Sequence, residues 1–147
     1  MTLPEQVAAV RRTIHRLITR RLSVRTRMPF QQLLALKAIA VEEVRTQAAL
    51  SERLLVDPPA VSRLVDRLEE DGLVQRRAGE DRRCVRLHVT ETGRAEMSAL
   101  IEESQRVEDE AGRYLTAAEM RELKRLLEKL QAGLMRTLHA SEGESAD

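Results

Sequence analysis

The hydrophobic period of this chain changes at Gly72, and that change restricts the fold more than any other feature of the sequence. Before Gly72, apolar residues recur at spacings of three and four, which is typical of helices. After it, a short segment at 73–77 leads to a polar tip at 78–82. An alternating run then places Val85, Leu87 and Val89 on one face. The pattern predicts one β-hairpin in an otherwise helical chain.

Two short helices are expected directly before the hairpin. Thr46 is a suitable N-cap for a helix through Leu54, because its hydroxyl can accept from a free backbone N–H. Asp57 followed by Pro58 is a stronger start signal, and Gly72 is a suitable stop for the helix that it opens. Two helices joined by a tight link and followed by a hairpin form a winged helix-turn-helix.

Further helices are expected on both sides of this unit. Apolar residues at helical spacing predict helices at 4–22, at 29–41 with Pro29 in its first turn, at 91–114 and at 117–140. The last of these carries leucines at alternating steps of three and four, a pattern that requires a partner helix. With one Phe, one Tyr and no Trp, the core must be aliphatic.

We therefore expect a mainly α fold with a small β-hairpin wing, a winged helix-turn-helix with further helices at both ends. The expected DNA-binding domain covers 29–90, and the flanking helical region covers 1–28 and 91–140. Residues 141–147 are polar and acidic, and they are expected to be disordered.

The helix after Asp57 has the charge pattern of a DNA-reading helix. Its apolar side faces a core, its first half is free of acids, and its last turn is acidic. Such a helix can enter the major groove by its N-terminal end. Arg63 could bind guanine, and Arg67 is better placed for the backbone. The exposed residues expected to contact DNA on this helix are Pro59, Ala60, Ser62, Arg63 and Arg67.

The hairpin tip provides a second expected DNA contact through Asp81, Arg82 and Arg83. The Asp81 carboxylate can pair with the Arg83 guanidinium and hold it extended. An arginine on a thin tip can enter a narrow minor groove, where the negative potential is enhanced. The alternative interpretation is a solvated turn held by salt bridges.

The segment from Gln47 to Ala95 resembles the MarR family of transcription regulators. The resemblance rests on Asp81-Arg82-Arg83 in the wing and on Val89-Thr90-Glu91-Thr92-Gly93 after it. It implies a homodimer formed by the first helix and the last two helices, with Arg83 in the minor groove. The resemblance thus makes 1–28 and 91–140 the helical dimerisation region, with N- and C-terminal dimerisation helices. It also implies a repressor that binds a pseudo-palindromic operator. Leu55 departs from the pattern, because many relatives have Gly in that turn.

Many MarR relatives respond to a small-molecule effector, and Arg11 and Arg21 are the residues that could bind an anionic one. They lie near the apolar face of the first helix. The alternative is an intersubunit salt bridge with the acids of the helix at 91–114. A redox response through the single cysteine, Cys84, is a further alternative, and so is a winged module that binds protein instead of DNA.

No enzyme motif is present in the sequence. The three histidines stand alone, and there is no HExxH, CxxC or glycine-rich phosphate loop. We therefore expect no catalytic residues, no cofactor and no metal. No stretch approaches the roughly 18 apolar residues of a membrane span, so a cytoplasmic location without membrane contact is expected.

Overall fold

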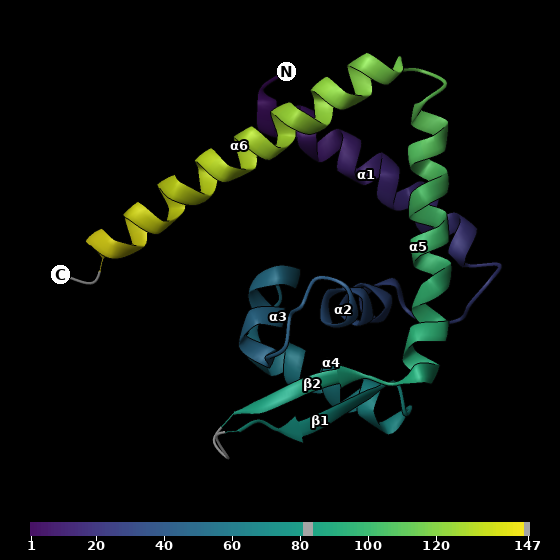
Figure 1. The fold of residues 1–147 in the computed structure, drawn as a ribbon, viewed down its shortest axis with the longest axis vertical. Coiled ribbons are helices and arrows are strands. Elements are labelled where there is room, and N and C mark those ends of the chain that lie inside the picture. Colours follow the sequence, from purple (N-terminus) through teal and green to yellow (C-terminus); the bar gives the residue numbers. More distant parts are fainter. Residues whose placement is uncertain (81–83, 146–147) are drawn as a thin grey trace. The chain divides into compact units, whose positions relative to one another are not determined.

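The computed structural model describes residues 1–80 and 84–145, and the chain divides into two compact units, Met1–Val107 and Glu108–Asp147. Figure 1 shows the elements in chain order. They are α1 (Leu3–Leu22), α2 (Phe30–Ala40), α3 (Gln47–Leu54), α4 (Pro58–Glu70), β1 (Val74–Ala78), β2 (Val85–Val89), α5 (Glu91–Ala111) and α6 (Ala117–Glu144). The expected mainly helical fold with one hairpin is confirmed.

Side-chain caps start α3 and α4 at the residues that the sequence predicts. The Thr46 hydroxyl accepts from Ala49 N–H at 3.1 Å, and the Asp57 carboxylate accepts from Ala60 N–H at 2.9 Å. Thr116 caps α6 in the same way. The sequence analysis missed the capping box of α1, in which Thr2 and Glu5 satisfy each other's backbone N–H groups.

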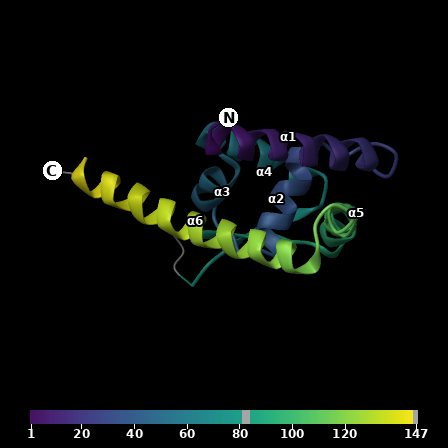
Figure 2. The ribbon, with the colours of Figure 1, turned by 90° about the horizontal axis from the view of Figure 1, so that it is seen from above.

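An aliphatic core fills the space enclosed by α2, α3, α4 and the hairpin, as the lack of aromatic residues predicts. Its most deeply buried side chains are Leu36, Ile39, Leu50, Val61, Val65, Leu68 and Leu87. A second cluster joins α1, α2 and α5 through Ile18, Leu22, Leu33 and Leu100 (Figure 2, seen almost along the axis of α5). Both clusters belong to the unit Met1–Val107.

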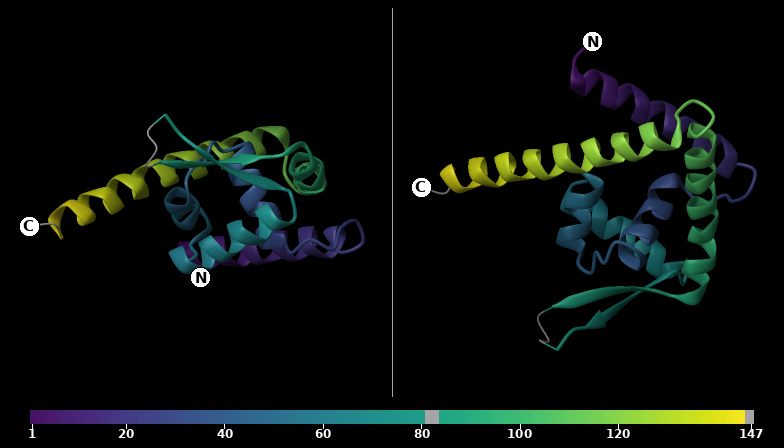
Figure 3. Two further views of the ribbon diagram at one scale, coloured as in Figure 1. Left: turned by 90° about the horizontal axis from the view of Figure 1, so that it is seen from below. Right: turned by 45° about the horizontal axis from the view of Figure 1, so that its top comes forward.

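The hairpin is fixed to the helices at its base. The strands β1 and β2 are antiparallel, with Val74 opposite Val89 and Ala78 opposite Val85. Leu87 N–H donates to the Arg45 carbonyl at 2.7 Å, so the link between α2 and α3 adds a hydrogen bond to the free edge of β2. Figures 1 and 3 show α4 and the hairpin at the same end of this unit.

Several element boundaries differ from the sequence prediction for local reasons. Pro29 has ψ 139° and precedes α2, where its carbonyl accepts the first helical hydrogen bonds. Leu73 lies before β1, because its N–H donates to Leu68 and its carbonyl accepts from Thr90. The helix expected to reach residue 114 ends at Ala111, where Gly112 opens a turn.

The C-terminal segment also differs from the prediction. Residues 141–144 were expected to belong to a disordered tail, but α6 continues through Glu144. No proline interrupts this stretch, and the Ser141 hydroxyl donates to the Leu138 carbonyl at 2.7 Å, a bond compatible with helix.

Candidate nucleic-acid interface

The turn between α3 and α4 has a strained residue at its centre. Leu55, at the C-cap of α3, has φ 54° and ψ 45°, the left-handed conformation that favours glycine. Its side chain is 91% exposed, so burial does not compensate for the strain. The Ser51 hydroxyl donates to the Val56 carbonyl and closes the turn. The fold therefore keeps the geometry of a tight helix-turn-helix although the position is not glycine.

Helix α4 presents the residues that the sequence predicts for its outer side. Val61, Val65 and Leu68 are buried, which turns the opposite side of the helix outward. Pro59, Arg63 and Arg67 are exposed, whereas Ala60 and Ser62 are half-buried. Arg67 is partly engaged, because its Nε lies 3.4 Å from the Asp71 carboxylate. Among the described residues Arg63 forms no ion pair, so its guanidinium can bind a new partner.

The outer face of the hairpin collects positive charge. The register places Arg77 opposite Arg86 and Gln75 opposite His88, and side chains of directly opposed residues share one face. Arg77 donates to the Gln75 side chain, and in the described part of the chain neither Arg77 nor Arg86 pairs with a carboxylate. Like charges facing each other across two strands destabilise a hairpin unless an anion lies between them.

His88 reports this positive potential. Its pKa lies below the ordinary value, first because the side chain is partly desolvated and then because Arg77, Arg45 and Arg86 repel a proton. A neutral histidine beside three arginines is expected at neutral pH. This basic cluster of Arg45, Arg77, Arg86 and His88 was not predicted as a unit, although strand alternation placed Arg86 and His88 on one face.

The predicted tip residues Asp81, Arg82 and Arg83 lie outside the described residues, and their assignment stays a prediction. Cys84 follows them directly and is exposed. No helix in the described ranges is both long and apolar enough to cross a bilayer. Within those same ranges, the ligating residue types form no cluster suited to a metal ion.

Arg76, next to Arg77 in β1, has a different environment. It points to the inner face, opposite Leu87, and only 24% of its side chain is exposed. Its guanidinium contacts Asp66 at 2.6 Å and Glu69 at 3.0 Å, both on α4. These contacts were not predicted from the sequence. The sequence signal for them is the alternation of side chains along a strand, which places Arg76 on the same, inner face as the buried Val74.

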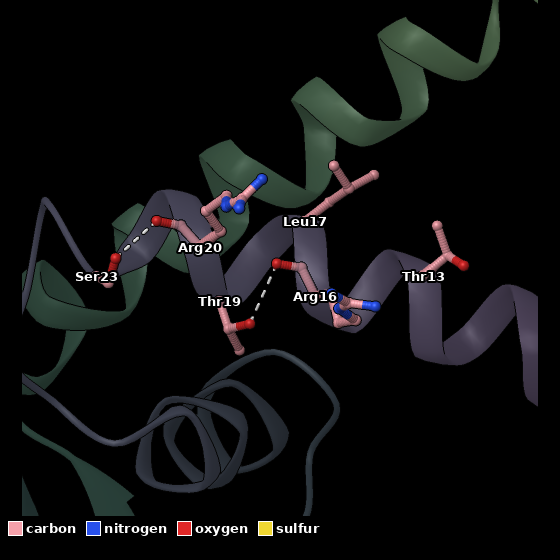
Figure 4. Close-up of a pocket in the computed structure, with 6 residues that line it drawn as sticks. All are labelled: Thr13, Arg16, Leu17, Thr19, Arg20 and Ser23. Carbon is pink, nitrogen blue, oxygen red and sulfur yellow. Dashed lines mark hydrogen bonds between the residues drawn. The ribbon is translucent and has the colours of Figure 1, made fainter.

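The predicted effector residues Arg11 and Arg21 lie on α1. Two shallow hollows lie along the second half of α1 and the turn after it, and neither includes Arg11 or Arg21 among the lining residues given by the structure. Figure 4 shows the larger, of about 510 Å³, beside Arg16 and Arg20. There the hydroxyls of Thr19 and Ser23 already donate to the carbonyls of the preceding turn. The role of Arg11 and Arg21 stays a prediction.

A further arginine, which the sequence analysis did not consider, pairs with two acids of α5. Arg25, in the turn after α1, contacts Glu102 and lies 2.9 Å from the carboxylate of Glu103. Glu103 is only 1% exposed, so this ion pair lies against the second apolar cluster. It ties the α1–α2 turn to α5 within one chain.

Comparisons with known proteins agree with this arrangement. The sequence model of the MarR family matches residues 28–83. No curated protein matches the chain. Among solved structures, a MarR family protein from Bacillus stearothermophilus is 25% identical, with a TM-score of 0.76, and the match covers 90% of this chain and 93% of that one.

Two structures of the regulator MarR itself are also similar. The oxidised form of MarR from E. coli is 27% identical with a TM-score of 0.74, over 89% of this chain and 95% of that one. The Multiple Antibiotic Resistance Repressor, MarR, is 29% identical with a TM-score of 0.74, over 88% and 95%. The strained turn, the capped α4 and the hairpin thus occur in the setting that the sequence motifs indicate: residues 28–83 match the MarR family, and the fold is that of the MarR winged-helix regulators.

Proposed function

We propose that this chain binds double-stranded DNA as a homodimer and represses transcription from a pseudo-palindromic operator. MarR family members generally bind DNA and act as dimers. One similar structure is that of a protein named as a repressor. The observation that carries the proposal for this chain is the basic outer face of the hairpin, where Arg77 and Arg86 oppose each other with no carboxylate partner among the residues that the structure describes.

DNA phosphates supply the anion that this face lacks. A duplex carries one negative charge per about 1.7 Å of its axis, and arginines that neutralise phosphates release counterions. The exposed start of α4, with Arg63 and no acid side chain in its first half, then suits the major groove. Asp81, Arg82 and Arg83 at the tip are proposed to enter the adjacent minor groove, and Arg67 to contact the backbone.

A second copy of the chain is the proposed partner of the terminal helices. Helix α6 has no buried residue, and its exposed apolar side chains are Leu123, Leu126, Leu127, Leu134, Met135 and Leu138. Helix α1 likewise exposes Leu3, Val7, Val10 and Ile14. Apolar stripes of this extent are usually covered by a partner. Removal of residues 116–147 should yield a monomer in light scattering, and a dimer of the truncated chain would contradict this assignment.

DNA binding is tested by a salt titration of binding to a mixed-sequence duplex, followed by fluorescence anisotropy. The wild-type affinity should fall steeply with salt, with a slope of about −0.9 for each phosphate contact. Arg77→Gln should lower that slope by about one contact. Arg121→Gln, an exposed change on α6, is the matched control and should leave it unchanged. No affinity for any duplex at low ionic strength would refute the proposal.

An effector is the remaining part of the proposed function. A small anion that binds near α1 would be recognised by arginines, and the predicted residues are Arg11 and Arg21. Isothermal titration with an aromatic carboxylate, with wild type and Arg11→Gln compared, tests this. Equal heats for the two proteins would remove Arg11 from the proposal.

A further inference from the structure

We propose that Arg76 is a positioning residue for DNA recognition, which holds α4 and the wing in a fixed relation and does not itself contact DNA. The inference rests on the proposed DNA-binding function, which it deepens. It assigns different tasks to two neighbouring arginines. Arg77 faces outward toward phosphate, and Arg76 faces inward toward the recognition helix.

The contacts of Arg76 join three elements. Its Nη2 lies 2.6 Å from Asp66 Oδ1, and its Nη1 lies 3.0 Å from Glu69 Oε1, both on α4. Its Nε donates to Gln47 Oε1 of α3 at 3.1 Å. Its backbone N–H donates to Glu69 Oε2 at 2.9 Å. Each nitrogen of the guanidinium therefore has an acceptor on the helix-turn-helix.

These contacts fix the orientation of α4 relative to β1, which apolar packing alone does not fix. The buried side chains Val65, Leu68 and Val74 press α4 and β1 together, but aliphatic contacts tolerate small rotations. A planar guanidinium that binds two carboxylates fixes both distance and orientation. The rotation of α4 decides which of its side chains face a base edge, and the angle of the hairpin decides where the tip reaches. Arg76 sets both.

Arg76 also offsets acid charge on the helix that must approach DNA. Asp66 and Glu69 would repel phosphate if they were unpaired. The pKa of Glu69 lies below its ordinary value, first because the Arg76 backbone N–H donates to it and then because of the Arg76 guanidinium. The Glu69 carboxylate therefore stays charged at neutral pH, and Arg76 pairs with it and with Asp66 from the protein side.

A pair of substitutions with opposite expected signs tests this role. Asp66→Ala and Glu70→Ala each remove one negative charge from an exposed position of α4, and each replaces it with a strong helix former. Among the described residues, Glu70 forms no ion pair. If only charge mattered, both variants would bind DNA more tightly. Positioning predicts that Asp66→Ala binds about fivefold more weakly, whereas Glu70→Ala binds equally well or more tightly.

The conservative substitution Arg76→Lys adds a second readout. Lysine keeps the charge but cannot reach three acceptors with one rigid fork. It should therefore bind DNA about as weakly as Arg76→Gln, with the wild-type salt slope. Arg76→Lys with wild-type affinity, or Arg76→Gln with a slope lowered by one contact, would show that Arg76 acts as a charge toward phosphate and would overturn the proposal.

Amide hydrogen exchange gives a readout that needs no DNA. The backbone amides of the β1–β2 ladder should exchange faster in Asp66→Ala than in Glu70→Ala, because the wing has lost its tie to α4. Equal exchange in the two variants overturns the positioning role whether or not DNA binds. If the wild type binds no duplex at low salt, the proposed function fails, and hydrogen exchange alone then decides whether Arg76 ties the wing to α4.

Discussion

Gly93 provides the most severe test of how the wing is joined to α5. A Cβ atom at this position would lie 2.3 Å from the Leu73 carbonyl oxygen and 2.7 Å from Val89 Cγ1. Normal contact requires a separation larger by about 1 Å, because packed atoms cannot overlap. The nearer obstacle is backbone, so no side-chain rotation can relieve it. Gly93→Ala must therefore displace the first turn of α5 from the end of α4.

The displacement acts on a connected set of hydrogen bonds. The Thr90 N–H donates to the Leu73 carbonyl at 3.0 Å, and the Thr90 hydroxyl donates to the Gly72 carbonyl at 2.7 Å. The same hydroxyl accepts from Gly93 N–H at 3.1 Å. Each bond contributes about 1 kcal/mol, and overpacking costs a further 1–3 kcal/mol or so. Alanine returns about 1 kcal/mol of helix propensity. If all three bonds are lost, we expect a net loss of about 3–5 kcal/mol in the free energy of unfolding.

Urea unfolding followed by circular dichroism at fixed protein concentration measures this loss. The matched control is Gly143→Ala near the end of α6, where a Cβ meets nothing within 4 Å. The control should be unchanged or up to about 1 kcal/mol more stable. A Gly93→Ala variant whose free energy of unfolding lies within about 1 kcal/mol of the wild-type value would refute the reasoning. The backbone would then be able to move away from the added Cβ atom at little cost.

Three other changes are predicted from single observations. Leu55→Gly should raise the free energy of unfolding by about 0.5–1 kcal/mol in urea, because Leu55 has φ 54° and is 91% exposed; Leu55→Ala, which keeps the strain, should not. Asp57→Ala should cost about 1 kcal/mol through loss of the cap on Ala60, and Asp57→Asn much less. The depressed pKa of His88 means that the unfolded chain binds a proton more readily, so stability should fall as pH drops below about 6.5. His88→Gln should weaken the fall in stability below about pH 6.5, and an identical pH profile would remove His88 as its cause.

Much of the fold was predictable because its signals are local. A cap depends on a side chain and a backbone N–H three residues away, so Thr46, Asp57 and Thr116 could be read from the sequence. Hydrophobic period likewise separates a helix from a strand within a few residues. The residues on the outer side of α4 were predictable for the same reason. Once Val61, Val65 and Leu68 are assigned to the buried side, the helical period places the other residues outside.

Features that depend on several elements at once were not predictable. The contacts of Arg76 require α3, α4 and β1 to be in place, and the sequence separations are 29, 10 and 7 residues. The buried carboxylate of Glu103 meets Arg25 across 78 residues. A helical period could not distinguish Glu103 from the exposed Glu102 beside it, because a polar residue on an apolar side depends on a partner from elsewhere.

The difference between local features and features that depend on several elements matters most for the charged residues. The formal net charge is only +1, and seven arginines without an acid lie at residues 11–27. Counting charge would place the DNA-binding surface there. The structure pairs Arg25 of that segment with acids of α5, and Arg76 of the hairpin with acids of α4. Arg77 and Arg86, in contrast, face each other without a carboxylate among the described residues. The arginines that lack an internal partner should therefore be the ones that bind phosphate. Arg76 and Arg77, although neighbours in one strand, should differ accordingly: substitution of Arg77 should lower the salt slope, and substitution of Arg76 should not.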